Sequence, residues 1–192
     1  MRTVFIVPVA IMAMVLNHLG EGASPRGTKS EAQECLRRNV PKKMLQELNK
    51  LTSDLIKSLP NDDIKHLKLL CKFGKSIKES KGIKILKELV DFYQGVFKEV
   101  SVKDESQKTI QILLSRLGKE VQHCLGPDQS RLPPAERNCI KKMNEKFVKL
   151  KSQGVSKAVG EFHVVLEWVD SFIHQKRSRR QQKTKPVLLK KH

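Results

Sequence analysis

The residues of this sequence best able to do chemistry are its four cysteines, Cys35, Cys71, Cys124 and Cys139. They lack the closely spaced pairs that zinc sites use, so a structural metal site is a poor interpretation. An even number of cysteines in a chain with a secretion signal predicts two disulfides. His123 beside Cys124 would suit a thiol–imidazole pair, but a disulfide-bonded cysteine with a polar neighbour is the stronger interpretation.

A catalytic site is harder to assemble from the remaining residues. Catalysis needs a nucleophile with a base, paired carboxylates or a metal cluster. The histidines are scattered along the chain, there is no glycine-rich phosphate loop, and no serine stands in a nucleophile-elbow context. We therefore expect a protein that is not an enzyme and that needs no cofactor.

The start of the chain predicts secretion. Met1 and Arg2 give a positive start, and an apolar run follows from Val4 to Leu16. That run is too short for a membrane-spanning helix, which needs about 20 residues. Small residues precede a plausible cleavage point before Ala23, so we expect a signal peptide over residues 1–22 and an extracellular product. The alternative is an uncleaved anchor or a buried helix.

The elements that would position any functional residue are helices. Apolar residues recur at spacings of three and four, which predicts amphipathic helices in an all-α bundle over residues 23–173. A glycine is expected to end the fifth helix at Gly154. The expected helices run from about Pro41 to Leu59, from Asn61 through Ile77, from Gly82 through Phe97, from about Asp104 to Cys124, from Ala135 to Leu150, and from Val155 to Ile173.

The charge of the chain predicts an affinity for polyanions. The formal net charge is +18, and residues 174–192 carry eight cations and no acidic residue. We expect this tail to be disordered and to bind heparan sulfate or nucleic acid. The stretch Arg177 to Arg180 resembles the Arg-x-Arg-Arg site that secretory proprotein convertases cleave. The cations of the tail are Lys176, Arg177, Arg179, Arg180, Lys183, Lys185, Lys190 and Lys191.

The stretch Gly154 to His163, which reads GVSKAVGEFH, resembles the final-helix signature of the interleukin-10 cytokine family. That signature has a glycine, then Lys-Ala, then Glu followed by Leu or Phe. The stretches Pro60–Leu70 and Leu166–Val169 support the resemblance. It implies the six-helix class II cytokine bundle and a secreted cytokine that signals in immune or epithelial responses.

The resemblance also implies receptor-binding residues. On spacing alone, Lys157 and Glu161 share a helix face and would form an exposed ion pair. In the family this face binds the primary receptor chain, and the first helix and the loop after it complete the surface. Many members have an acidic residue where this sequence has His163, so the sequence departs from the family pattern there. The implied partners are class II cytokine receptor chains, the interleukin-20 receptor alpha and interleukin-10 receptor beta chains, with Janus kinases and STAT factors downstream. The candidates on the first helix and its loop are Lys42, Lys50, Asp54, Asp62 and Lys65.

The family also guides the expected disulfides. Cys35 and Cys124 stand where the family has one bridge. Cys71 lies earlier and Cys139 later than the second family pair, so the resemblance implies a displaced Cys71–Cys139 bridge. The sequence is compatible with both a monomer and a homodimer.

A different class of function competes with the cytokine interpretation. It is a cationic secreted effector, of antimicrobial type, that binds membranes, DNA or glycosaminoglycans directly. Its support is the net charge together with lysine-rich helix faces, although lysines on a helix are usually only solvated. The relevant lysines of the expected fifth helix are Lys141, Lys142, Lys146 and Lys149.

Overall fold

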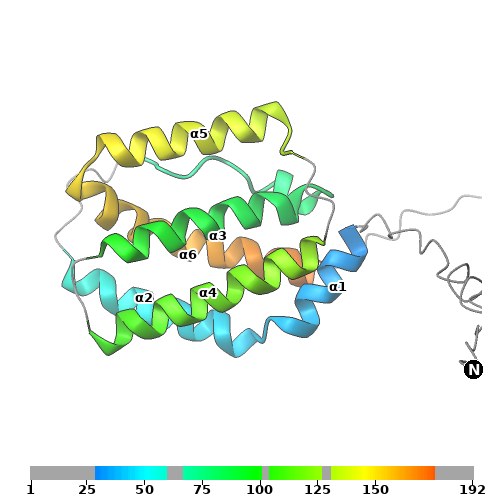
Figure 1. Cartoon of the computed structure of the whole chain (residues 1–192), viewed down its shortest axis with the longest axis horizontal. Helices are drawn as coiled ribbons and strands as arrows, with labels where there is room; N and C mark the ends of the chain where they lie inside the picture. Colours follow the sequence, from blue (N-terminus) through cyan, green and yellow to red (C-terminus); the bar gives the residue numbers. More distant parts are fainter. Residues whose placement is uncertain (1–28, 60–66, 101–103, 127–130, 176–192) are drawn as a thin grey trace, which may run out of the picture.

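The computed structural model of the chain describes residues 29–59, 67–100, 104–126 and 131–175. These residues form six α-helices and one short 3-10 helix, and they contain no β-strand (Figure 1). No helix in the described part of the chain is long and apolar enough to cross a membrane. The elements are α1 Lys29–Asn39, α2 Lys42–Ser58, η3 Ser76–Lys78, α3 Gly82–Glu99, α4 Glu105–Leu125, α5 Pro134–Lys149 and α6 Ser152–His174.

Helix α3 lies at the centre of the bundle and packs against α4, α5 and α6. Nine of its 18 residues are buried, and they recur at spacings of three and four along the helix. The ring of Tyr93 lies 4.7 Å from that of Phe162, and the ring of Phe97 lies 5.1 Å from the same ring, centroid to centroid. This aromatic cluster joins α3 to α6 at the centre of the core.

Local sequence signals set the junction between α3 and α4. The Asp104 carboxylate accepts a hydrogen bond from the Gln107 backbone N–H at 2.7 Å, which caps the start of α4. The buried Gln107 side chain then donates to the backbone oxygens of Phe97 and Val100, both at 3.1 Å. These bonds satisfy carbonyls at the end of α3 that have no partner within the helix.

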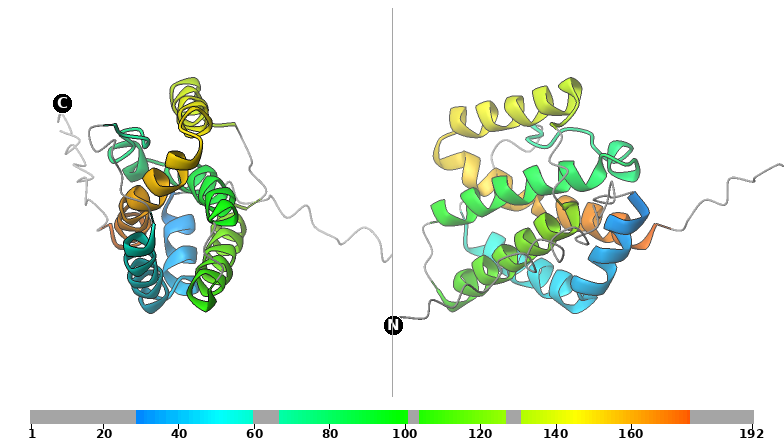
Figure 2. Two further views of the ribbon diagram at one scale, coloured as in Figure 1. Left: turned by 90° about the vertical axis from the view of Figure 1, so that its left-hand side faces the viewer. Right: turned by 45° about the vertical axis from the view of Figure 1, so that its right-hand side comes forward.

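Helix α5 lies on the outside of the bundle, as the end-on view of Figure 2 shows. It buries only Glu136, Ile140 and Met143. The predicted break at Gly154 is wrong, because α5 gives way to α6 earlier, at Lys151, whose φ is 52°. Gly154 lies in the first turn of α6, where a Cβ atom would stand 2.6 Å from the Phe147 backbone oxygen. The glycine therefore permits a close approach between the two helices.

The predicted helices before α3 need two corrections. Helix α1 was not expected, because few of its residues are apolar; it buries only Ala32 and Leu36. The predicted helix from Asn61 through Ile77 is wrong over its described part. Residues 67–75 are irregular, and only the single turn of η3 follows them. The apolar residues of this segment still enter the core, with Leu69 and Phe73 buried.

Two disulfides fasten the described chain. Cys35 on α1 is bonded to Cys124 at the end of α4, with their Cα atoms 5.5 Å apart. Cys71 in the irregular segment is bonded to Cys139 on α5, with a Cα separation of 6.1 Å. These are the pairs that the family resemblance implied, and all four cysteines are used.

Candidate functional site

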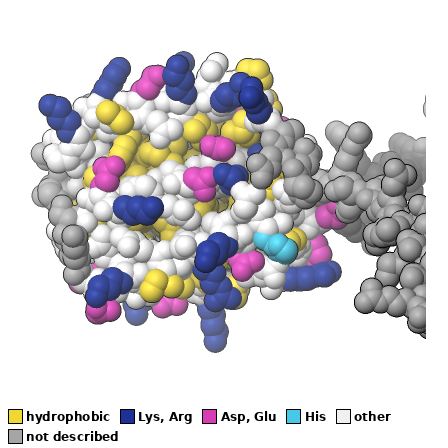
Figure 3. Space-filling view, viewed as in Figure 1, with side chains coloured by type: hydrophobic (Ala, Val, Ile, Leu, Met, Phe, Trp, Pro, Cys, Tyr) yellow, Lys and Arg dark blue, Asp and Glu magenta, His cyan; other side chains and the backbone are white. Residues whose placement is uncertain are grey.

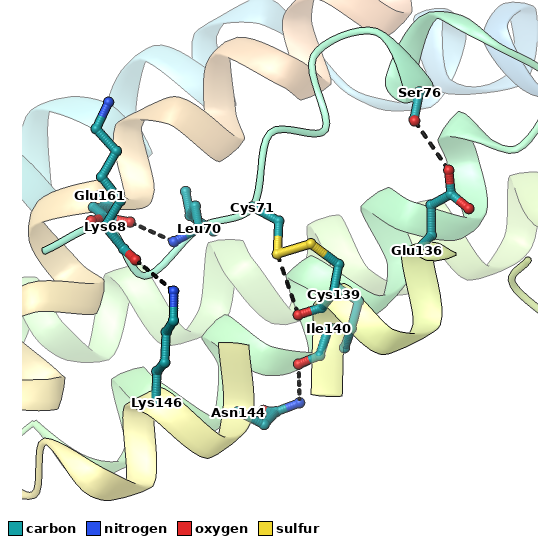
Figure 4. The surroundings of a disulfide bond; sticks show 10 residues. All are labelled: Lys68, Leu70, Cys71, Ser76, Glu136, Cys139, Ile140, Asn144, Lys146 and Glu161. Atoms are coloured by element: carbon teal, nitrogen blue, oxygen red, sulfur yellow. Dashed lines mark hydrogen bonds between the residues drawn. A yellow bond between two sulfur atoms is a disulfide. The ribbon is translucent and has the colours of Figure 1, made fainter. Parts of the chain in front are cut away.

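The irregular segment 67–75 is held against α6 by one carboxylate. Both oxygens of Glu161 accept a hydrogen bond from the Leu69 N–H, at 3.0 and 3.1 Å. One of them also accepts from the Leu70 N–H at 2.8 Å, the bond that Figure 4 shows. Backbone N–H groups outside a helix need acceptors when they are partly buried. Glu161 supplies these acceptors and so fixes the path of the segment.

Lys157 completes this arrangement from one turn earlier on α6. Its Nζ lies 3.7 Å from a Glu161 carboxylate oxygen, and the two side chains are only 7% and 16% exposed. The prediction of a solvent-exposed ion pair is therefore wrong, because both side chains are mostly buried and segment 67–75 lies against Glu161. Glu161 positions this segment, and both residues present little surface to a partner.

The charge of Glu161 acts on a buried neighbour, the hydroxyl of Tyr93. Burial raises the pKa of the Tyr93 hydroxyl well above its ordinary value, and the negative charge of Glu161 raises it further. The Tyr93 hydroxyl has no hydrogen-bond partner among the described residues. A charge-assisted hydrogen bond is stronger in such an environment than in water.

Three further contacts hold the segment and η3 to α5 (Figure 4). The first is the Cys71–Cys139 disulfide. The second is a hydrogen bond of 3.3 Å from the Lys146 ammonium to the Lys68 backbone oxygen. The third is a bond of 3.1 Å from the Ser76 hydroxyl to the carboxylate of Glu136. Each end of the segment is thus attached to a regular helix.

The Glu136 carboxylate is also ion-paired. One of its oxygens lies 2.6 Å from the ammonium group of Lys81, the residue that precedes α3. The hydrogen bond from Lys81 lowers the pKa of Glu136, and the bond from Ser76 lowers it further. Glu136 therefore joins the start of α5 to η3 and to the start of α3.

A groove of about 690 Å³ opens between this fixed segment and α6. Trp168 lies in it, with its ring edge-to-face against Phe73 at 6.0 Å between centroids. The backbone of Gly74 passes close by, since a Cβ atom there would lie 3.8 Å from the Trp168 Nε1. The groove is lined by Lys72, Gly74, Lys75, Ile77, Lys78, Glu167, Trp168 and Ser171.

The groove is basic and has the composition of a binding surface. Lys72, Lys75 and Lys78 are exposed, and their side chains form no ion pair or hydrogen bond with another described residue. Tryptophan in a partly desolvated pocket is a typical hot spot of protein interfaces, and lysines around it attract acidic groups. No group of three His, Cys, Asp or Glu residues in the described part of the chain could hold a metal ion. The arrangement suits recognition of a partner.

The other predicted receptor residues lie away from this groove. Lys42 and Lys50 are exposed on α2, as is Asp54, whose carboxylate pairs with Lys57 at 2.7 Å. His163 is exposed on α6, and its Nδ1 lies 2.9 Å from the Gly160 backbone oxygen. None of these residues lines the groove.

Several predicted residues lie outside the described part of the chain. They include the loop candidates Asp62 and Lys65 and every cation of the predicted tail. Helix α6 runs to His174, so the first residue of that predicted tail is helical. The signal peptide and the convertase site also lie outside the described residues.

Sequence reasoning missed the groove residues Lys72, Lys75, Lys78 and Ser171. The signal was present: three lysines recur every third residue, and Trp168 is the single tryptophan of the chain. The expected helix over this stretch hid it, because lysines on a helix are usually only solvated.

No protein-family model matches the chain, and no curated protein matches its sequence. The described part of the chain is an all-α helical bundle with two disulfides. Two disulfides are compatible with a secreted protein.

Proposed function

We propose that this protein is a secreted cytokine of the interleukin-10 family that binds and pairs class II cytokine receptor chains. Within the family, the stretches Pro60–Leu70 and Leu166–Val169 are most similar to interleukin-26, with interleukin-22 as the nearest alternative. The observation that carries the proposal is the basic groove around Trp168. It gives an all-helical, disulfide-linked chain a surface suited to protein recognition.

In this proposal the groove docks one receptor chain, and the exposed face of α2 with Lys42, Lys50 and Asp54 is a separate candidate contact. Segment 67–75 keeps the groove in shape before binding, which reduces the entropy lost on association. A second surface holds the other receptor chain, and pairing of the two chains starts Janus kinase and STAT signalling. The expected pair is the interleukin-20 receptor alpha and interleukin-10 receptor beta chains.

A STAT phosphorylation assay on cells that express defined receptor pairs tests the proposal. The groove variant carries Lys72→Glu, Lys75→Glu and Lys78→Glu. We expect its half-maximal concentration to rise at least about ten-fold, because its charges would repel an acidic receptor loop. The control variant reverses three exposed lysines of α5 through Lys141→Glu, Lys142→Glu and Lys149→Glu, and we expect a change below about two-fold.

Two results would count against the proposal. Absence of STAT phosphorylation with every class II receptor pair would remove the cytokine function. Equal weakening by the groove and control variants would show that overall charge governs the response and that the groove does not dock a receptor. Circular dichroism of each variant checks that the helices are intact.

The alternative is a cationic effector that binds membranes, DNA or glycosaminoglycans directly. One observation favours it: α5 exposes Lys141, Lys142 and Lys149 on its outer side, next to Val148, which is 72% exposed. Direct polyanion binding falls steeply with salt because released counterions drive it, whereas receptor binding depends less on salt. A salt series of both activities therefore separates the two functions.

A further inference from the structure

The groove around Trp168 presents several hydrogen-bond donors and few acceptors. The side chains of Lys72, Lys75 and Lys78 form no ion pair or hydrogen bond with another described residue. The indole N–H of Trp168 also has no acceptor in the described part of the chain. Among the described residues of the lining, Glu167 is the one acidic residue. The groove is therefore suited to an anionic group on its partner.

The turn η3 brings two of these lysines together. The Lys78 N–H donates to the Lys75 backbone oxygen at 3.0 Å, which is the bond of a 3-10 turn. Side chains three residues apart eclipse each other in such a turn, so Lys75 and Lys78 project from one side of it. The face that Figure 3 shows is different, because basic and acidic side chains are interspersed over it. The groove thus concentrates positive charge that its own surroundings do not balance.

We propose that the groove binds a sulfated tyrosine on the receptor chain that docks there. The sulfate would lie among the lysines, and the tyrosine ring would cover the exposed part of Trp168. The Trp168 ring already packs edge-to-face against Phe73, at 6.0 Å between centroids, so its position is set before a partner arrives. The groove volume of about 690 Å³ lies within the range of about 300 to 1,000 Å³ that small-ligand pockets have.

A ring joined to an oxyanion suits this lining better than an ordinary acidic residue does. An aspartate or glutamate would pair with a lysine but would leave the apolar surface of Trp168 in water. A sulfate ester also keeps its negative charge throughout the physiological pH range, and tyrosine is sulfated in the secretory pathway, where receptor ectodomains mature. This inference rests on the proposed receptor function, because it names the chemistry of the partner at the same groove.

Titration of the full chain with a synthetic peptide tests the site, and the single tryptophan of the chain reports on it directly. The peptide carries one sulfotyrosine among alanines and aspartates, and a second peptide has tyrosine in its place. We expect the fluorescence of Trp168 to change on binding. The sulfated peptide should bind at least about ten-fold more tightly, because only its oxyanion reaches the lysines. Inorganic sulfate should bind more weakly than the sulfated peptide, since it offers Trp168 no ring.

Matched variants assign the charges. The groove variant carries Lys72→Gln, Lys75→Gln and Lys78→Gln. The control removes the same charge from exposed positions of α5, through Lys141→Gln, Lys142→Gln and Lys149→Gln. We expect the sulfated peptide to bind the groove variant at least about ten-fold more weakly and the control less than about three-fold more weakly. Should the groove variant fail to fold, Glu167→Gln is expected to tighten binding about two-fold, because it removes the acidic residue that repels the sulfate.

Three outcomes of these titrations would overturn the proposal. Equal affinity for the two peptides would show that the aspartates alone are recognised. Equal weakening in the groove and control variants would show only diffuse attraction by net charge. Binding that leaves the Trp168 fluorescence unchanged would place the peptide elsewhere on the molecule.

A cell assay separates this inference from the receptor function on which it rests. In cells that lack tyrosine sulfotransferase activity but display equal amounts of receptor, the half-maximal concentration for STAT phosphorylation should rise at least about five-fold. An unchanged value would overturn the sulfotyrosine proposal and leave receptor docking intact. Peptide binding as expected, with no STAT response from any class II receptor pair, would instead overturn the receptor function.

Discussion

Two carboxylates on this chain join segments that lie far apart in sequence. Glu161 accepts the N–H groups of Leu69 and Leu70, and Glu136 accepts bonds from Lys81 and Ser76. Both side chains are mostly buried, at 16% and 10% exposed. At this depth a charged acceptor contributes more than an exposed ion pair does, because removing it leaves its donors unsatisfied. The shape of the groove therefore depends on acidic residues behind it.

The pairing of Glu136 should make stability depend on pH. Its folded-state pKa is lowered, chiefly by the hydrogen bond from Lys81, so its contribution is complete above the unfolded pKa of about 4.3. It is then lost as pH falls through the lower folded-state pKa. We expect Glu136→Gln to lower the free energy of unfolding at pH 7 by about 1 to 2 kcal/mol. Urea denaturation from pH 7 to pH 3 should show this difference shrinking below about pH 4.

Glu145→Gln is the matched control for that change. Glu145 is an exposed residue of the same helix, 3.9 Å from Lys141, and its loss should cost less than about 0.5 kcal/mol. A Glu136 effect that stays constant down to pH 3 would mean that the carboxylate acts through shape and not through charge.

At the scale of elements, the junction of α5 and α6 depends on a glycine. A Cβ atom at Gly154 would meet the Phe147 backbone oxygen, whereas nothing lies within 4 Å of a Cβ atom at Gly160 in the same helix. We expect Gly154→Ala to lower the free energy of unfolding by about 1 to 3 kcal/mol through overpacking. Gly160→Ala should raise it by about 0.5 to 1 kcal/mol, since alanine favours a helix. Thermal and urea unfolding measure both, and stabilisation by both changes would contradict the close approach.

Sequence patterns predicted those elements whose signals are local. The proline before α2 and the capping Asp104 of α4 are such signals, and both helices begin within a residue of their expected positions. Segment 67–75 could not be predicted in this way. Its backbone is fixed by Glu161, whose position is 92 residues away from Leu69, and by a bond to Cys139. Periodicity reports which residues are buried, but it does not report what accepts their backbone hydrogen bonds.

The same limit applies to the candidate site. The spacing of Lys157 and Glu161 indicated that the two side chains share a helix face, but not that both are mostly buried, with Glu161 against a neighbouring segment. Trp168 shares a groove with Lys78 of η3 and with Lys72 and Lys75 of the preceding segment. They share it because that segment follows an irregular path. The groove residues could be identified individually in the sequence, but their proximity in the fold could not be predicted from it.

At the scale of the whole molecule, the two disulfides connect different pairs of elements. Cys35–Cys124 ties α1 to α4 within the bundle, whereas Cys71–Cys139 ties the irregular segment to the outer helix α5. The sequence separations are 89 and 68 residues. The chain-entropy estimate for loops of these lengths is about 4 to 5 kcal/mol in each case. Their stabilising effects should thus be similar, while their effects on the groove should differ.

We expect Cys71→Ser with Cys139→Ser to expose segment 67–75 selectively. Amide hydrogen exchange at Leu69 and Leu70 should accelerate more than exchange in the core of α3, and the free energy of unfolding should fall by about 4 to 5 kcal/mol. STAT signalling should also weaken, because the groove loses its shape when the segment is released. Removing Cys35 and Cys124 instead should accelerate exchange at all these amides alike. Unchanged exchange at Leu69 and Leu70 in the first variant would show that Glu161 and the other noncovalent contacts are sufficient to hold the segment.

The outer rim of the groove is open to redesign. Helical surfaces are hard to reshape, because every residue must also keep the hydrogen-bond ladder of its own backbone. Segment 67–75 has no such ladder; its course is set at a few anchor points, among them the two N–H groups on Glu161 and the sulfur of Cys71. A library that varies Lys72 and Lys75 while it keeps the anchors would therefore sample new partner specificities on an unchanged scaffold.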